Sequence, residues 1–296
     1  MDAYHEMIKE ICNELNIEFN IIADDWVMVL KSGYKLNVIT GYKFPLNSHS
    51  VGMLFDDKGL LYEFCKLEDI NIIEHKVFFE NYKKEDAIKY FNDHKKEVIL
   101  KGNLGTCGRE VFKINDENTL IETMNKLMKS QYSVSLCPYY HIDHEYRVFV
   151  LDNKIKLIYG KTRPIVFGDG KKTLLELAQD FNPLFYNDKK NQKFKKDYVP
   201  KKNEKICLDF RFNLANGAVP FIDINGTILS KLIDFTENLI DKIDIGFASV
   251  DIIDVDGTLY LMEINSGVMI NKLVDFNLVD RETIKNIYKE AIKMMF

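Results

Sequence analysis

The sequence predicts an α+β protein with two antiparallel sheets behind a short N-terminal α+β segment. Its 296 residues are 46% hydrophobic and 29% charged, which suits about two folded domains and argues against disorder. Short β-like runs alternate with amphipathic helical patterns along the chain. After Ser130 the character changes to extended and hairpin patterns, so we expect a second sheet to begin there.

The first half of the chain supplies the N-terminal segment and the first sheet. Apolar residues at helical spacing predict helices over 2–15, from 57, over 84–95 and from 116 to 128, the last capped by Asn115 or Asp116. Strands are expected at 17–22, 26–30, 36–40, 98–102 and 110–114, the last two flanking the glycine-bearing turn GNLGTCG.

The second half alternates hairpins with helices. Residues 133–140 are extended, and 145–161 predict a hairpin that turns at Asp152-Asn153. Helices are expected at 173–181, 227–243 and 281–295, with a further hairpin at 247–265. Residues 188–205 hold eight lysines against three acids, which indicates a solvated loop; this loop could also attract an acidic substrate.

The composition excludes several classes of protein. Forty Lys and Arg against 45 Asp and Glu give a net charge of −5, so no overall field draws the chain to nucleic acid or to an anionic membrane. There is neither a signal-peptide pattern nor an apolar run long enough to span a membrane. The five cysteines are far apart and form no CxxC pair. We expect a soluble, cytoplasmic protein with reduced thiols and no nucleic-acid or membrane partner.

The segment ASVDIIDVDGTLYLMEINSG is the most informative stretch for function. Glu263 and Asn265 lie two apart on a strand and therefore share a face. Asp251 lies on the preceding strand of the hairpin and joins that face only if the loop between the two strands has an odd number of residues. We therefore expect a three-residue loop, 255–257, so that residue 254 pairs with residue 258. Two carboxylates and an amide oxygen would hold Mg²⁺ together with substrate phosphates. Acids are also common in turns, but Glu263 lies in an apolar run where an unpaired charge is costly.

Lys101 ends an apolar strand directly before the glycine-bearing turn. Glycines allow backbone N–H groups to approach phosphate oxygens, so this turn could bind phosphate, although a flexible β-turn has the same composition. It is neither a Walker A loop nor a GxGxxG fingerprint. The segment HIDHE at 141–145 lacks the spacing of a zinc motif.

In their order along the chain, these motifs resemble the ATP-grasp superfamily, in particular its carboxylate-amine ligase branch, which contains cyanophycin synthetase and bifunctional glutathione synthetase. The resemblance covers roughly residues 45–270. It is carried by the segments FDDKGLLYEFCKLEDINIIEH, VILKGNLGTCGREVFKI, SLCPYYHIDHEYRVFVLDNKI, KTRPIVFGDGKKTLLEL, YVPKKNEKICLDFRFNLANG and SVDIIDVDGTLYLMEINSG. It implies two lobes, 51–133 and 134–296, whose antiparallel sheets grip ATP, behind an N-terminal segment of residues 1–50.

The resemblance also implies roles for individual residues. Lys58 and Lys101 would contact ATP phosphates, with the loop of Gly105, Thr106 and Gly108 closing over them. Cys137, Tyr139, Glu145 and Lys161 would also bind ATP. Main-chain groups of residues 137–140 would bind the adenine, Glu145 the ribose, and Lys161 the phosphates. Asp251, Glu263 and Asn265 would bind two Mg²⁺ ions, with Mn²⁺ as an alternative. Arg163, Arg211, Asn213 and Gly217 would contact the substrate, and Arg211 and Lys161 would assist catalysis.

The implied activity is an ATP-dependent ligase that joins a carboxylate to an amine through an acyl phosphate, acting on amino acids or peptides; such an enzyme could form a homo-oligomer. Three positions depart from the family pattern, namely Gly102, Cys137 and Ala218. They motivate an alternative, an ATP-binding regulatory module without ligase activity. A phosphotransferase on the same fold is a third option.

Overall fold

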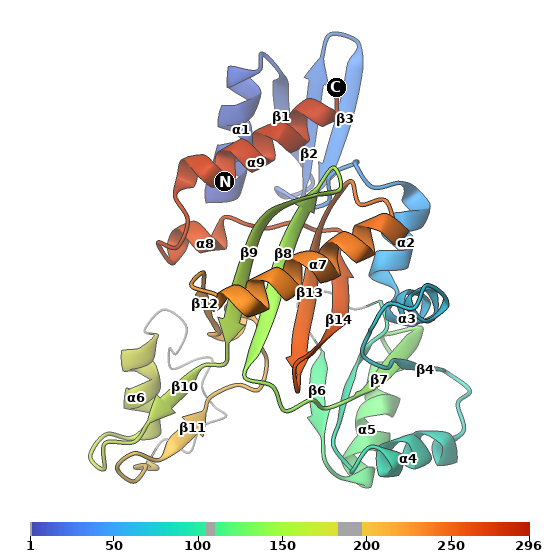
Figure 1. Cartoon of the computed structure of the whole chain (residues 1–296), viewed down its shortest axis with the longest axis vertical. Helices are drawn as coiled ribbons and strands as arrows, with labels where there is room; N and C mark the ends of the chain where they lie inside the picture. The colour runs from blue at the N-terminus through green and yellow to red at the C-terminus, as the bar shows by residue number, and fades with distance from the viewer. Residues whose placement is uncertain (1, 105–109, 183–196) are drawn as a thin grey trace. The chain divides into compact units, whose positions relative to one another are not determined.

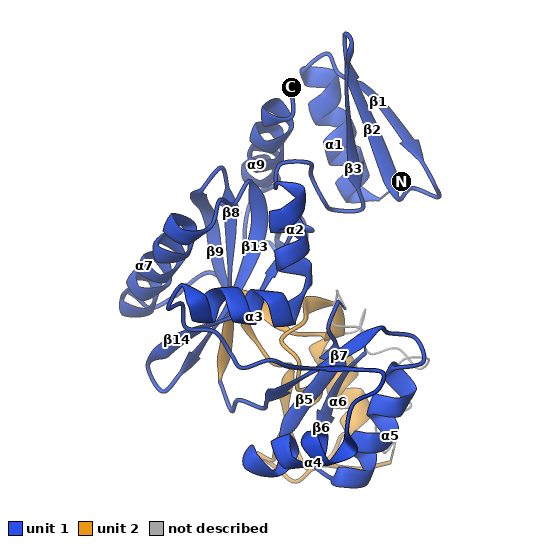
Figure 2. Cartoon of the chain, turned by 90° about the vertical axis from the view of Figure 1, so that its right-hand side faces the viewer, with its two compact units in different colours: residues 1–142, 146–159, 222–296 blue, residues 143–145, 160–221 orange. Residues whose placement is uncertain are grey.

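The computed structural model describes residues 2–104, 110–182 and 197–296. Two compact units make up the chain (Figure 2). Unit 1 comprises residues 1–142, 146–159 and 222–296, and unit 2 comprises residues 143–145 and 160–221. The chain therefore passes from unit 1 into unit 2 and back twice. No helix of the described ranges is long and apolar enough to cross a membrane.

The N-terminal segment is a helix packed on a small antiparallel sheet, as the sequence predicts (Figure 1). Its elements are α1 (Ala3–Glu14), β1 (Glu18–Ile22), β2 (Val27–Ser32) and β3 (Lys35–Thr40). The apolar positions of α1, including Met7, Ile8 and Ile11, are buried. The final helix, α9 (Arg281–Met294), packs against α1, so the two ends of the chain belong to one substructure.

A four-stranded antiparallel sheet with the order β4-β7-β5-β6 follows. Its strands are β4 (Lys76–Phe79), β5 (Val98–Gly102), β6 (Val111–Ile114) and β7 (Ser133–Pro138). The helices of this region are α2 (His49–Asp56), α3 (Lys58–Leu67), α4 (Lys84–Asp93) and α5 (Glu117–Leu127). Buried apolar residues of α4 and α5 form one core with those of the four strands. The sequence prediction included α3, α4 and α5 but missed α2.

The second sheet has five strands in the order β12-β9-β8-β13-β14. They are β8 (His144–Leu151), β9 (Lys154–Thr162), β12 (Val219–Phe221), β13 (Phe247–Val255) and β14 (Thr258–Asn265). The β8–β9 turn is Asp152-Asn153, as predicted, and both residues have positive φ. The helix α7 (Gly226–Lys242) buries Leu232 and Leu239 and contacts β14, and a short helix, α8 (Lys272–Asp275), precedes α9.

Unit 2 also holds a two-stranded sheet of β10 (Ile165–Phe167) and β11 (Lys205–Cys207). In the sequence, β10 and β11 are separated by α6 (Leu174–Phe181), which begins with a capping box of Thr173 and Glu176. A 3₁₀ turn, Leu214–Asn216, comes before β12. The described structure is α+β with antiparallel sheets throughout, as the sequence predicts.

Candidate functional site

The β13–β14 hairpin brings the three predicted metal ligands together, but by a different route from the predicted one. Its loop is the two-residue turn Asp256-Gly257, with Val255 opposite Thr258, so the predicted three-residue loop is wrong. Both turn residues have positive φ, 51° and 86°, as a type I′ turn requires. A regular ladder from this turn would have placed Glu263 on the face opposite to Asp251.

A β-bulge corrects the register. The pairing shifts between Asp251 and Ile252, so that Ile252 faces Leu261 while Asp251 faces Glu263, and Met262 is the extra residue. Asp251 and Glu263 are thereby direct cross-strand neighbours. The Asn265 Nδ2 atom lies 3.2 Å from Asp251 Oδ2 and 3.2 Å from Glu263 Oε1. The structure thus places all three predicted ligands in one contact group.

Arg147 on β8 completes this group and was not among the predicted site residues. Its Nε donates to Asp251 Oδ1 (2.7 Å) and its Nη2 to Asp251 Oδ2 (2.6 Å). The Asp251 side chain is only 1% exposed, so this side-on pair keeps its charge compensated in a nearly dry place. The two residues are 104 positions apart. In the sequence, Arg147 lies within the segment SLCPYYHIDHEYRVFVLDNKI, where nothing singled it out as a site residue.

Two lysines set the charge around Glu263. Lys58 at the start of α3 and Lys101 in β5 are both buried, and the Lys58 Nζ donates to the Asn103 carbonyl oxygen (3.2 Å). Burial lowers the pKa of Lys58, although the nearby Glu263 charge opposes that shift. Burial alone would raise the pKa of Glu263, but the charges of Lys101 and Lys58 hold it below its ordinary value. Glu263 is therefore ionised at neutral pH.

The donor set fits a hard divalent cation that is completed by other ligands. Two carboxylates and an amide oxygen are oxygen donors of the kind that Mg²⁺ takes, usually with waters and substrate phosphates in the remaining positions. No group of three His, Cys, Asp or Glu side chains suited to a metal occurs among the residues that the structure describes. A closed, all-protein metal cage is therefore not what this group provides.

The predicted base-binding segment, residues 137–140, begins in the last two residues of β7 and continues beyond the strand. Cys137 is buried in a small apolar cluster with Ile73 and Ile253, and burial raises the pKa of its thiol. The Tyr139 N–H donates to the Glu97 carbonyl oxygen (3.0 Å). The Lys113 Nζ lies 3.6 Å from the centre of the Tyr139 ring, a cation–π contact that fixes the ring. Cys137 thus belongs to an apolar cluster whose other members include residues of β5, β13 and β14.

Unit 2 holds the other predicted side chains. Glu145 and Lys161 are both buried and form an ion pair through Oε1 and Nζ. Arg163 donates from Nε to the Phe210 carbonyl oxygen (3.0 Å), and its guanidinium lies 4.7 Å from the Phe212 ring centre. The Arg163 guanidinium therefore makes a cation–π contact with the Phe212 ring and a hydrogen bond with the backbone.

The segment 209–217 is ordered by its own side chains. Arg211 pairs with Asp209 through Nε–Oδ1 (2.9 Å) and Nη2–Oδ2 (2.7 Å), a hydrogen bond that raises the pKa of Arg211. Asn213 caps the 3₁₀ turn by accepting from the Ala215 N–H (2.8 Å), and Gly217 ends that turn with φ 91°. Asn213 and Gly217 therefore have a clear structural use in addition to their predicted role. Gly105, Thr106 and Gly108 lie outside the described residues.

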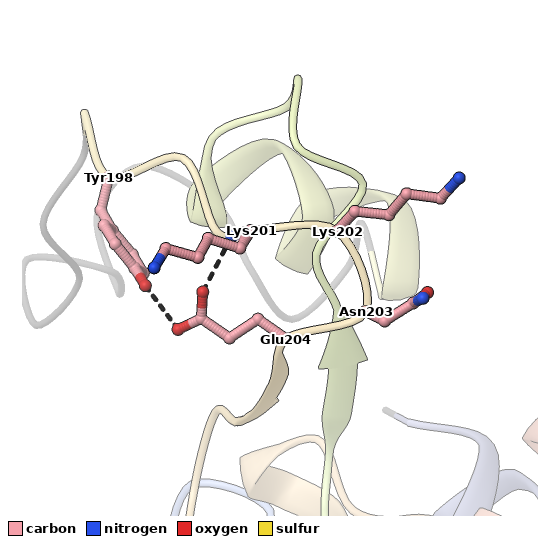
Figure 3. A pocket seen from close by; sticks show the side chains of 5 residues that line it. All are labelled: Tyr198, Lys201, Lys202, Asn203 and Glu204. Atoms are coloured by element: carbon pink, nitrogen blue, oxygen red, sulfur yellow. Dashed lines mark hydrogen bonds between the residues drawn. The ribbon is translucent and has the colours of Figure 1, made fainter.

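The described end of the lysine-rich loop forms a shallow turn with a cavity of about 410 Å³ (Figure 3). Glu204 accepts from the Tyr198 hydroxyl (2.5 Å) and from the Lys201 N–H (2.8 Å), which closes the turn. Figure 3 shows the Lys202 side chain pointing away from Glu204. Backbone hydrogen bonds join the turn to Gly168, whose N–H donates to the Glu204 carbonyl oxygen (2.9 Å) and whose carbonyl oxygen accepts from the Asn203 N–H (2.8 Å).

Comparison with known proteins identifies the fold. No protein-family model matches the chain. No curated protein matches it by sequence either. Among solved structures, a bifunctional glutathione synthetase from Pasteurella multocida aligns with 98% of this chain and 43% of its own (16% identity, TM-score 0.55). The chain thus spans less than half the length of that enzyme.

Two further solved structures are similar to this chain over most of its length. A D-alanine–D-alanine ligase from Bacillus anthracis aligns over 82% of this chain and 69% of its own (13% identity, TM-score 0.54). The ATP-grasp ligase PsnB, solved with a minimal precursor, aligns over 85% and 64% (12% identity, TM-score 0.51). The protein has the ATP-grasp fold, which confirms the resemblance inferred from its motifs.

Proposed function

We propose that this protein is an ATP-dependent ligase that joins a carboxylate to an amine through an acyl-phosphate intermediate. One observation carries the proposal: Asp251, Glu263 and Asn265 form a single contact group, and Lys58 and Lys101 hold Glu263 ionised. The ATP-grasp fold and the ligases that share it support the same reaction class. Amino acids or peptides are the proposed substrates, by analogy with those ligases.

The charges of this group suit a nucleotide bound with its cations. Lys58, Lys101 and Arg147 carry three positive charges against the two negative charges of Asp251 and Glu263. The surplus of one positive charge attracts the polyphosphate, while the carboxylates remain available to divalent ions. Phosphoryl transfer depends mainly on positioning and on neutralising charge, so a preorganised group of this kind addresses the principal barrier.

The reaction has two steps. An oxygen of the substrate carboxylate attacks the γ-phosphorus, the bond from that phosphorus to the β,γ-bridging oxygen breaks, and ADP leaves. The nitrogen of the amine then attacks the carbonyl carbon of the acyl phosphate, the carbon–oxygen bond to phosphate breaks, and the amine loses a proton. Mg²⁺, when bound by Asp251, Glu263 and Asn265, neutralises charge on the phosphates. Lys58 and Lys101 orient the polyphosphate from the protein side.

The further roles proposed for residues of unit 2 rest on the resemblance of their sequence segments to ATP-grasp ligases. Lys161 is proposed to contact the phosphates and Glu145 the ribose, and the two side chains form an ion pair with each other. Arg163 and Arg211 are proposed to bind the substrate carboxylate or the acyl phosphate. Arg211 is held in a side-on pair with Asp209, so its planar guanidinium has a fixed orientation for bidentate recognition.

The test is ATP turnover. The protein is incubated with ATP, Mg²⁺ and pools of amino acids or short peptides, and ADP and phosphate are measured. We expect release that depends on both a carboxylate and an amine, with a new amide product detected by mass spectrometry. Nucleotide binding without ADP release in any pool would support the alternative, a binding module. ADP release without amide formation would support a phosphotransferase.

A further inference from the structure

Arg147 contacts Asp251 from one side of β13, and the other proposed ligands contact it from the opposite side. In the sheet order β8-β13-β14, Arg147 comes from β8, and Glu263 and Asn265 come from β14. The guanidinium meets both carboxylate oxygens side-on, with Nε at 2.7 Å from Oδ1 and Nη2 at 2.6 Å from Oδ2. Asp251 is thus held between a fixed cation and the β14 donors.

The side-on pair fixes how the Asp251 carboxylate is turned. A bidentate arginine meets both oxygens of a carboxylate in one plane, which adds geometric specificity to the ion pair. The Arg147 side chain is 25% exposed whereas the Asp251 side chain is 1% exposed, so the arginine joins a buried carboxylate to the solvent-accessible edge of the group. Without Arg147, the buried Asp251 carboxylate would lose two charge-assisted hydrogen bonds.

We propose that Arg147 is a positioning residue that orients Asp251 as a metal ligand before any cation arrives. The inference rests on the proposed role of Asp251 in Mg²⁺ binding. An incoming ion then meets a carboxylate whose orientation is already set, so binding requires little rearrangement. Arg147 acts through Asp251 and does not itself touch the ion.

The test uses three variants and one control. Arg147→Met removes the guanidinium while keeping much of the side-chain volume, Arg147→Lys keeps the charge but not the fork, and Asp251→Asn removes the ligand charge. Arg281→Met is the matched control, because Arg281 also pairs with a carboxylate, that of Glu10 (2.9 Å), but at an exposed position. Each full-length protein is titrated with Mn²⁺ in the presence of a non-hydrolysable ATP analogue, and bound Mn²⁺ is followed by electron paramagnetic resonance. Thermal unfolding in EDTA is measured in parallel.

We expect Arg147→Met to weaken Mn²⁺ binding by about tenfold or more, as the loss of a residue that orients a metal ligand does. Arg147→Lys should recover part of that loss, and in the Asp251→Asn background Arg147→Met should add little. In EDTA, Arg147→Met should lower the Tm by roughly 5 °C or more, because it leaves a buried charge without its partner. Arg281→Met should match the unmodified protein in both measurements.

Two results would overturn the proposal. Tighter Mn²⁺ binding in Arg147→Met would show that the arginine competes with the ion, and unchanged binding would show that it has no positioning role. If Arg147→Met fails to fold, the affinity of Arg147→Lys decides in the same way. If Asp251→Asn leaves Mn²⁺ binding unchanged, the metal assignment itself fails, which separates that failure from the failure of the Arg147 role. No substrate is needed for these measurements.

Discussion

Replacing Glu263 by Gln tests whether the carboxylate pair of the β13–β14 hairpin supports phosphoryl transfer. Glutamine has the same shape, and its amide oxygen can still accept the hydrogen bond that Asn265 Nδ2 gives to Glu263 Oε1 at 3.2 Å. The β-bulge is a backbone feature and remains. The change therefore removes one charge and little else, and it raises the local surplus from one positive charge to two.

The expected loss is large because the missing charge lies where the divalent ions would bind. Removing one preorganised electrostatic group from an active site typically costs a factor of about 10²–10³ in rate, or about 3–4 kcal/mol of transition-state stabilisation. We expect ADP formation at saturating ATP to fall by at least that factor, and Mn²⁺ binding with an ATP analogue to weaken. The fold should persist, with far-ultraviolet circular dichroism unchanged.

The control is Glu237→Gln, the same substitution at an exposed position of α7. It should keep full turnover and the same Tm. Undiminished ADP formation in Glu263→Gln across a range of Mg²⁺ concentrations would refute the metal assignment. A collapse of the fold in Glu263→Gln would contradict the claim that the β-bulge and the hairpin are independent of this charge.

Three further substitutions and one deletion test other parts of the structure. A Cβ on Gly246 would lie 2.1 Å from a backbone carbonyl oxygen, so Gly246→Ala should lower the free energy of unfolding by about 1–3 kcal/mol or more. Gly52 lies in α2 with open space around it, so Gly52→Ala should raise the free energy of unfolding by up to about 1 kcal/mol. Urea denaturation measures both changes. Hydrogen bonds from two lysines of α9 lower the pKa of Glu14 from 4.5 to about 2. The ionised Glu14 side chain therefore stabilises the fold fully above pH 4.5, and this stabilisation is lost as the pH falls towards 2. The difference in Tm between the unmodified protein and Glu14→Gln should shrink across that window and stay constant from pH 5.5 to 7. Deleting Met262 removes the extra residue of the bulge but leaves the Asp251–Glu263 pairing intact, so Mn²⁺ affinity should persist although the Tm falls; a loss as large as that of Glu263→Gln would show that the bulge itself shapes the site.

Much of the fold follows from local patterns, because most of the described helices and hairpins have a recognisable apolar period together with a cap or turn signal. Asp116, for example, caps α5 as the sequence indicates, with its carboxylate accepting from the Thr119 N–H at 2.8 Å. The helix α2 was missed because only Phe55 of its eight residues is buried, so it has no apolar stripe to recognise. Short strands such as β10 and β12, three residues each, are likewise set by their partners rather than by their own composition.

The hairpin shows where sequence reasoning about the site fails. The prediction that Asp251 and Glu263 share a face is confirmed, since the two residues pair across the strands. Its physical basis is that a buried carboxylate needs polar or charged neighbours. The inferred three-residue loop was wrong because counting residues around a turn assumes an unbroken ladder. Asp256-Gly257 is a strong signal for a two-residue type I′ turn, and a single bulge at Met262 reconciles that turn with the required face. Two local facts, turn chemistry and face sharing, were each visible in the sequence and jointly required a bulge.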